Sequence, residues 1–139
     1  MKQKRQVGFS MIELLVVLVI LGLLAGLVGP QFFGKVDSAK IRTAETQVKM
    51  FKMALQTYRL DMGNYPSALD DLSTAPANVR NYWDGPYLDE KMPKDPWNNN
   101  YQYRLDSSTA QGFYLYSWGA DGKEGGDELN TDIGYVPVN

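Results

Sequence analysis

Apolar residues are distributed unevenly along the chain, and this division predicts two parts with different surroundings. Residues 9–29 are almost wholly apolar, whereas the sequence after Lys35 is mixed or polar. A helix of about 21 residues rises roughly 30 Å, which matches the hydrocarbon thickness of a membrane. Residues 1–8 carry three cations, which favour a cytoplasmic location for this end. The pattern therefore predicts a single membrane-crossing helix with the C-terminal part on the opposite side.

A cleaved secretory signal is the alternative for this segment, because Ala25-Gly26 or Gly29 could serve as a small-residue cleavage site. Glu13 argues against that alternative. An ionised carboxylate inside a membrane costs at least a few kcal/mol and is retained mainly where it finds a partner. A side chain close enough to the interface to reach water is one interpretation of Glu13, and pairing with a cation is the other.

A second apolar pattern predicts an amphipathic helix over residues 36–62. Its apolar positions recur in steps of three and four, which places them on one helical face. They are Ile41, Ala44, Val48, Phe51, Leu55 and Tyr58. Gly63 should end the helix before Pro66. With residues 9–35 this makes one stem, in which we expect a break near Pro30 because proline removes an amide donor.

The C-terminal half predicts a small antiparallel sheet. Two alternating runs, 101–105 and 113–118, are joined by a turn and form a hairpin. A third strand should come from the C-terminal region or from Tyr87-Leu88, and residues 67–72 should form a short helical turn. The fold class is α+β, with the sheet covering the helical stripe. The abundant aromatic residues could form a sugar-binding platform, but packing in a small core is favoured.

Composition narrows the chemistry that this chain can perform. Its 139 residues include no Cys and no His, which excludes disulfides, thiolate or imidazole metal sites, and catalytic triads that depend on either residue. The net charge of −2 argues against nucleic-acid binding. Acidic residues scattered over the loops could offer a pair for glycoside hydrolysis, but solvated carboxylates are favoured because no spacing implies a cleft. Most common enzyme mechanisms are therefore excluded.

Residues 117–134 combine oxygen-bearing side chains with five glycines and little apolar content. Calcium prefers six to eight oxygen ligands, and glycines allow backbone carbonyls to converge on an ion. The stretch is not an EF-hand, because Lys123 and Gly125 stand where Asp or Asn would be required. From the residues alone, a calcium site and a flexible acidic loop both remain open.

The N-terminal residues Gly8-Phe9-Ser10-Met11-Ile12-Glu13-Leu14 resemble the class III signal of type IV pilins and type II secretion pseudopilins. The resemblance implies that a prepilin peptidase cuts after Gly8 and that Phe9 becomes a methylated N-terminus. The new ammonium would lie about one helical turn from Glu13. If neighbouring subunits are offset by a similar rise, Glu13 of one subunit neutralises Phe9 of the next and sets the register.

The C-terminal residues Gly119-Ala120-Asp121-Gly122 and Asp132-Ile133-Gly134 resemble the calcium loop of major pseudopilins of type II secretion systems. The resemblance implies that Asp121 and Asp132 bind calcium together with the main-chain carbonyl of Trp118. The remaining side-chain ligand is less defined, because the family's usual Asp before Asp132 is missing here. The candidates are Asn130 through its amide oxygen, then Asp127 and Glu128.

These resemblances extend over nearly the whole chain and imply its organisation. Residues 1–8 would be a cleaved leader, 9–35 a transmembrane and polymerisation helix, and 36–139 a periplasmic head with helix 36–62 and calcium loop 117–134. The implied protein is the major subunit of a pseudopilus, anchored in the bacterial inner membrane by a single pass before assembly. The resemblance also implies a structural protein that is not an enzyme. Its implied partners are further copies of itself, minor pseudopilins, the prepilin peptidase, and indirectly a membrane platform and a cytoplasmic ATPase.

Three other functions compete with this one. A type IV pilin for adhesion or twitching commonly closes its C-terminal loop with a disulfide, which this chain cannot form. A monomeric membrane-anchored binding module would have no use for Glu13. A membrane-tethered hydrolase would need a pair of acids that no motif indicates.

Overall fold

The computed structural model describes residues 8–79 and 81–138 and divides the chain into two compact units. The first unit ends at Asp37 and the second begins at Ser38. The elements are α1 (Met11–Met62), η1 (Leu69–Leu72), β1 (Gln102–Leu105), β2 (Phe113–Ser117), η2 (Glu128–Asn130) and β3 (Ile133–Tyr135). Helix α1 contributes to both units. The leader cations predicted to orient the chain lie outside the described residues.

The start of α1 is set by Ser10. The backbone N–H of Glu13 donates to Ser10 Oγ at 3.2 Å, and the N–H of Leu14 donates to the Ser10 carbonyl at 3.2 Å. A serine followed three residues later by glutamate is a sequence signature of a helix N-terminus. The helix therefore begins at Met11, two residues after the predicted start at Phe9.

The predicted break near Pro30 is wrong for this structure, because α1 runs through Pro30 without interruption. Proline removes one backbone donor and crowds the carbonyl one turn earlier, but the residues on either side keep their own helical hydrogen bonds. A long helix with strong apolar helix formers can absorb that local loss. The resemblance to pilins and pseudopilins also implies that this segment unwinds in an assembled filament, and that implication stays a prediction.

The N-terminal part of α1 exposes its apolar side chains. Leu18 is 61% exposed, Leu23 is 71% exposed and Leu27 is 70% exposed. Within the described residues, α1 is the helix that is long and apolar enough to cross a membrane, and the most apolar window is not buried against the protein. Side chains of this kind need lipid or another protein chain as their surroundings.

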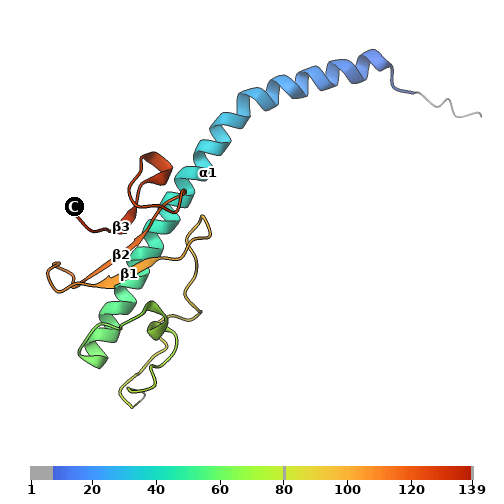
Figure 1. Cartoon of the computed structure of the whole chain (residues 1–139). Helices are drawn as coiled ribbons and strands as arrows, with labels where there is room; N and C mark the ends of the chain where they lie inside the picture. Colours follow the sequence, from blue (N-terminus) through green and yellow to red (C-terminus); the bar gives the residue numbers. More distant parts are fainter. Residues whose placement is uncertain (1–7, 80, 139) are drawn as a thin grey trace, which may run out of the picture. The chain divides into compact units, whose positions relative to one another are not determined.

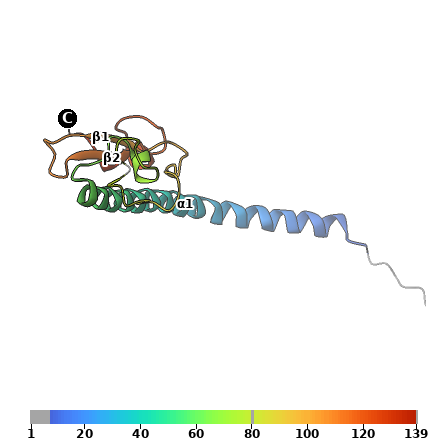
Figure 2. The same ribbon diagram turned by 90° about the horizontal axis from the view of Figure 1, so that it is seen from below.

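In the second unit, one face of α1 is buried beneath the sheet (Figures 1 and 2). Five of the six predicted stripe positions are buried, and Ile41 is half-buried. Phe51 and Leu55 are completely buried within the core cluster. The helix ends at Met62, as predicted from the glycine that follows. Gly63 adopts φ +79° and donates its N–H to the Arg59 carbonyl at 2.8 Å.

The sheet has the strand order β1-β2-β3 and is antiparallel throughout. Leu105 lies opposite Phe113 across the predicted hairpin, and Leu115 lies opposite Tyr135 in β3. The third strand therefore comes from the C-terminal region, and Tyr87-Leu88 does not form it. The inward positions of β2 are Phe113, Leu115 and Ser117, and all three are fully buried.

Aromatic residues fill the core, as favoured from the sequence. The ring of Phe113 contacts those of Tyr65, Tyr103 and Tyr135 at centroid separations of 5.0, 6.0 and 6.2 Å. Phe51 meets Tyr101 edge to face at 5.0 Å. The predicted helical turn at 67–72 is present as η1, whose Leu69 and Leu72 are buried.

Candidate functional site

The N-terminal candidate residues surround the start of α1. Gly8 and Phe9 precede the helix and are exposed, with Phe9 exposed by 87%. A peptidase needs an accessible, non-helical segment, and the bond after Gly8 lies in one. Glu13 occupies the first helical turn, where the positive end of the helix dipole favours a carboxylate. The role of Ser10 in holding this turn was not predicted, although the Ser-x-x-Glu spacing carries the signal.

The C-terminal loop is held closed by its own backbone. The N–H of Ala120 donates to the Leu129 carbonyl at 2.8 Å, which joins the outgoing limb of the loop to the returning one. The short helix η2 precedes the return, with the N–H of Asn130 donating to the Asp127 carbonyl at 3.0 Å. Strand β3 then pairs with β2 and anchors the end of the loop in the sheet.

Gly119 lies where the two limbs meet. Its φ is +68°, and a Cβ placed on it would lie 2.8 Å from each of the carbonyl oxygens of Leu129 and Thr131. A side chain at this position would therefore be both conformationally strained and too close to the returning limb. Two main-chain oxygens converge here that the sequence analysis did not name. Main-chain convergence has no side-chain signature beyond the glycine that permits it.

Asp132 carries the strongest indication that the loop is shaped for a cation. Its Oδ2 accepts the N–H of Gly125 at 2.9 Å. Its Oδ1 is buried and has no hydrogen-bond partner. A buried carboxylate oxygen without a partner loses its hydration and gains nothing in return. A hard cation would be a suitable partner for such an oxygen, so the surroundings of this one carboxylate are compatible with a calcium ligand.

The other predicted ligands differ in their surroundings. Asp121 is exposed on the outgoing limb, and its Oδ1 accepts the N–H of Lys123 at 3.1 Å. Asn130, Asp127 and Glu128 are exposed, and Glu128 adopts φ +52°. Among residues 8–79 and 81–138, no group of three or more acidic side chains is placed to hold a metal. Any ion in this loop would therefore have at most two acidic side chains as ligands, and its remaining ligands would be neutral oxygens.

A buried polar network lies under the loop and was not predicted. Asp95 is 4% exposed, and the Ser117 hydroxyl donates to its Oδ2 at 2.5 Å. Ser117 Oγ accepts the N–H of Gly119 at 3.1 Å, and the Asn99 amide donates to the Gly119 carbonyl at 3.3 Å. The available signal was Ser117 itself, a polar residue at an inward position of an alternating strand.

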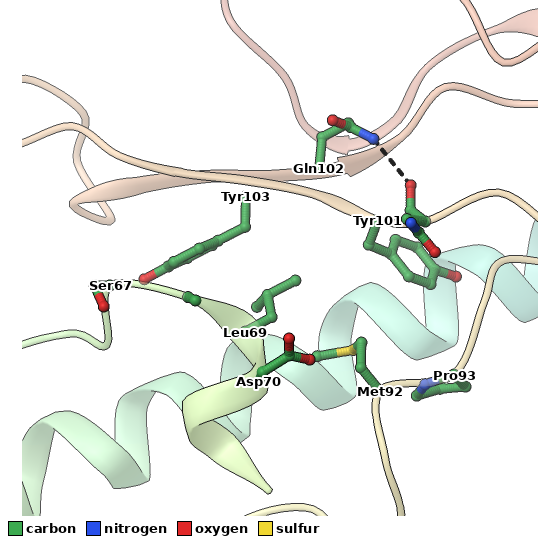
Figure 3. A pocket seen from close by; sticks show the side chains of 10 residues that line it. Ser67, Leu69, Asp70, Met92, Pro93, Tyr101, Gln102 and Tyr103 are labelled. Carbon is green, nitrogen blue, oxygen red and sulfur yellow. Dashed lines mark hydrogen bonds between the residues drawn. The ribbon is translucent and has the colours of Figure 1, made fainter. Parts of the chain in front are cut away.

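A surface pocket elsewhere on the head bears on the alternative functions (Figure 3). Tyr101 and Tyr103 lie on one side of it, and η1 and Met92 lie on the other. The Tyr101 hydroxyl donates to Gln47, and the Tyr103 hydroxyl donates to the Pro66 carbonyl at 2.8 Å. Asp70 is the single acid among the described residues that line the pocket. A glycosidase needs two carboxylates, and this pocket supplies one.

The chain is similar to known proteins over most of its length. Residues 31–136 match the family described as "Type II secretion system (T2SS), protein G", and residues 3–29 match the prokaryotic N-terminal methylation motif. Type II secretion system core protein G of Pseudomonas aeruginosa is 44% identical, over 96% of this chain and 97% of the relative. The Vibrio cholerae protein of that name is 41% identical, over 96% and 93% respectively.

A solved structure also resembles this chain. The crystal structure of the major pseudopilin from the type 2 secretion system of enterohaemorrhagic Escherichia coli has a TM-score of 0.56 and 27% sequence identity. The match covers 73% of this chain and 90% of the solved one. The chain thus combines an N-terminal methylation motif with a capped apolar helix. A small antiparallel sheet packs on the same helix. The chain belongs to the type II secretion system protein G family.

Proposed function

We propose that this chain is the major pseudopilin of a type II secretion system, a structural subunit that polymerises into a pseudopilus and drives the export of folded proteins. The observation that carries the proposal is the pairing of an exposed apolar helix with the methylation motif at its start. An exposed apolar helix requires lipid or partner chains around it. The helix of a pseudopilin is surrounded by lipid before assembly and by other subunits afterwards.

Processing and assembly follow from the position of Glu13. The precursor is anchored by α1 in the bacterial inner membrane with its head in the periplasm. A prepilin peptidase cuts after Gly8 and leaves an ammonium on Phe9, which is then methylated. In a growing filament, Glu13 of one subunit pairs with that ammonium on the next. The pair compensates two charges that would otherwise be stranded in an apolar core, and it sets the axial register.

The proposed role is mechanical. Further copies of the chain build the shaft, minor pseudopilins form the tip, and a membrane platform with a cytoplasmic ATPase adds subunits at the base. The growing shaft pushes exported proteins through an outer-membrane secretin. The family assignment favours this role over that of a type IV pilin, a binding module or a hydrolase.

The test is to express the chain in Pseudomonas aeruginosa cells that lack their own protein G. We expect Phe9 to be the N-terminal residue by mass spectrometry and fibres to be visible by electron microscopy when the chain is overproduced. The variant Gly8→Asp is the control and should leave an uncut precursor without fibres. A chain that is cut after Gly8 and inserted in the membrane but never forms fibres would contradict the proposal.

We further propose that the loop of residues 117–134 binds calcium. The ligands would be the carboxylates of Asp121 and Asp132, the carbonyl of Trp118 and the amide oxygen of Asn130. The unpartnered Oδ1 of Asp132 supports this assignment. When bound, the ion would join the two limbs of a loop that cannot be closed by a disulfide, because the chain has no Cys.

Thermal unfolding of the full-length chain in detergent tests the calcium site. Ligand binding to the folded state raises the free energy of unfolding by about 2.7 kcal/mol at a hundredfold excess over Kd. We expect calcium to raise the Tm of the wild type and of Glu124→Gln, an acidic loop residue with no assigned role. Asp132→Asn should remove that increase. An identical Tm in calcium and in chelator for the wild type would eliminate the site.

A further inference from the structure

Asp95 is a buried carboxylate to which the proposed function gives no role. Burial of a charged group is costly unless hydrogen bonds replace its hydration. Asp95 meets that requirement. Its Oδ1 accepts the N–H groups of Trp97 at 3.1 Å and Asn99 at 2.8 Å, and its Oδ2 accepts the Ser117 hydroxyl. The carboxylate therefore holds its own turn closed and also contacts the last residue of β2.

The hydrogen bond to Asp95 determines which further hydrogen bond the Ser117 hydroxyl can form. A serine hydroxyl has one proton, and here it is donated to the carboxylate. The oxygen is then left as an acceptor, and it accepts the N–H of Gly119 at 3.1 Å. Because Ser117 is fully buried, water does not compete for either bond. Asp95 thus sets the direction of a hydrogen bond at the entrance to the loop.

The N–H of Gly119 belongs to the same peptide unit as the carbonyl of Trp118. A trans peptide is planar, and its N–H and C=O point in opposite directions. Holding the N–H against Ser117 therefore fixes the direction in which the Trp118 carbonyl points. The following peptide is held as well, since Asn99 donates to the Gly119 carbonyl and Ala120 donates to Leu129.

We propose that Asp95 is a positioning residue of the loop, acting through Ser117 to orient the Trp118 carbonyl toward a divalent cation. Asn99, whose own N–H is bound by Asp95, does the same for the next peptide. The inference rests on the calcium site proposed above. It extends that site to the turn of residues 95–99, which contacts the start of the loop at Ser117 and Gly119.

The test measures calcium affinity in the full-length chain in detergent, by calorimetric titration after removal of divalent ions. Groups that orient metal ligands typically change affinity by 10- to 100-fold when they are removed. We expect Ser117→Ala to raise the Kd about tenfold. Asp95→Asn should have a similar effect, because its amide would donate to Ser117 and reverse the bond. Asn99→Ala should also raise the Kd, because it removes the bond to the Gly119 carbonyl. Asn100→Ala is its matched control, since Asn100 is exposed and adjacent.

A role confined to folding predicts a different result. In that case the Kd would follow the Tm measured without calcium across all variants. Ser117→Thr separates the two, because it keeps the hydroxyl and adds a methyl group at a fully buried position. We expect Ser117→Thr to lower the Tm while keeping wild-type affinity. Affinity that falls with Tm in this variant would overturn the positioning role.

The outcomes also separate this inference from the calcium proposal. If the wild type binds calcium and both Ser117→Ala and Asp95→Asn bind it equally well, the positioning role is overturned and the calcium site stands. If the wild type itself binds no calcium, both are overturned together. Weaker binding by Ser117→Ala and Asp95→Asn, with unchanged binding by Asn100→Ala, supports the inference.

Discussion

The two ends of α1 share one backbone geometry and bury their apolar residues in opposite ways. Leu18 and Leu23, in the first unit, are exposed by 61% and 71%, whereas Phe51 and Leu55, in the second, are fully buried. The difference lies in the pattern. Apolar residues surround the helix completely near its start and form a single stripe near its end. A complete apolar surface needs partners from outside the chain, and a stripe needs only the chain's own sheet.

The largest effect is expected at Glu13, the charged residue within the otherwise apolar first part of α1. Glu13→Leu and the isosteric Glu13→Gln should insert in the membrane but leave the Phe9 ammonium of a neighbouring subunit unpaired. When coexpressed with the wild type, each variant should be depleted about tenfold or more from sheared filaments, by quantitative mass spectrometry. Immunoblots of the membrane fraction control for insertion. Incorporation equal to that of the wild type would exclude the pairing.

A pair of leucine truncations compares the two regions directly. Leu55→Ala removes a fully buried side chain from the head and should cost about 2–5 kcal/mol of unfolding free energy. Leu18→Ala removes an exposed side chain from the same helix and should change head unfolding by less than about 0.5 kcal/mol. Denaturant titration in detergent measures both. Equal losses would show that the two parts of α1 do not differ in the way described.

Two glycines in the loop provide a smaller, matched comparison. Gly119 and Gly125 both adopt positive φ, at +68° and +81°, but only a Cβ on Gly119 would meet neighbouring atoms. Each alanine variant should lose about 1 kcal/mol from the left-handed conformation. Gly119→Ala should lose about 1–3 kcal/mol more through crowding against the returning limb. Similar unfolding free energies for the two variants would show that the limbs are not closely packed.

The smallest effect is expected at high pH, where the Tm of the head should fall. Burial, with a smaller contribution from the charge of Asp95, raises the pKa of Tyr101. An unfolded tyrosine ionises near pH 10, while the folded one keeps its proton. Stability from this residue is therefore complete below about pH 10 and declines as the pH rises beyond it. Tyr101→Phe should reduce that decline in Tm between about pH 9 and 11. A decline as steep as in the wild type would assign it to other groups.

The sequence predicted those features whose cause is local. The stripe, the stop at Gly63 and the β1–β2 hairpin each follow from neighbouring residues, and all are confirmed. The third strand was ambiguous because β3 has three residues, too few to show an alternating pattern. The predicted break at Pro30 is wrong because the helix on both sides of the proline keeps its own hydrogen bonds and tolerates the loss of one donor.

The candidate sites were also predictable only where their residues lie close together in the sequence. Glu13, Asp121 and Asp132 could be named from motifs, because each motif lies within a few consecutive residues. Asp95 and Ser117 are 22 residues apart and meet only when the hairpin packs. The carbonyls that converge on Gly119 belong to Leu129 and Thr131, whose side chains give no sign of it. Contacts that depend on tertiary packing or on the main chain alone were therefore beyond the sequence.

The serine at the start of α1 has a consequence for maturation. Ser10 lies beyond the proposed cleavage point, so the residue that caps the helix stays with the mature subunit when the leader is removed. The proposed cleavage would change the charge near the helix end and would leave the capping Ser10 in place. A membrane-anchored precursor could thus become a filament subunit without refolding the start of α1.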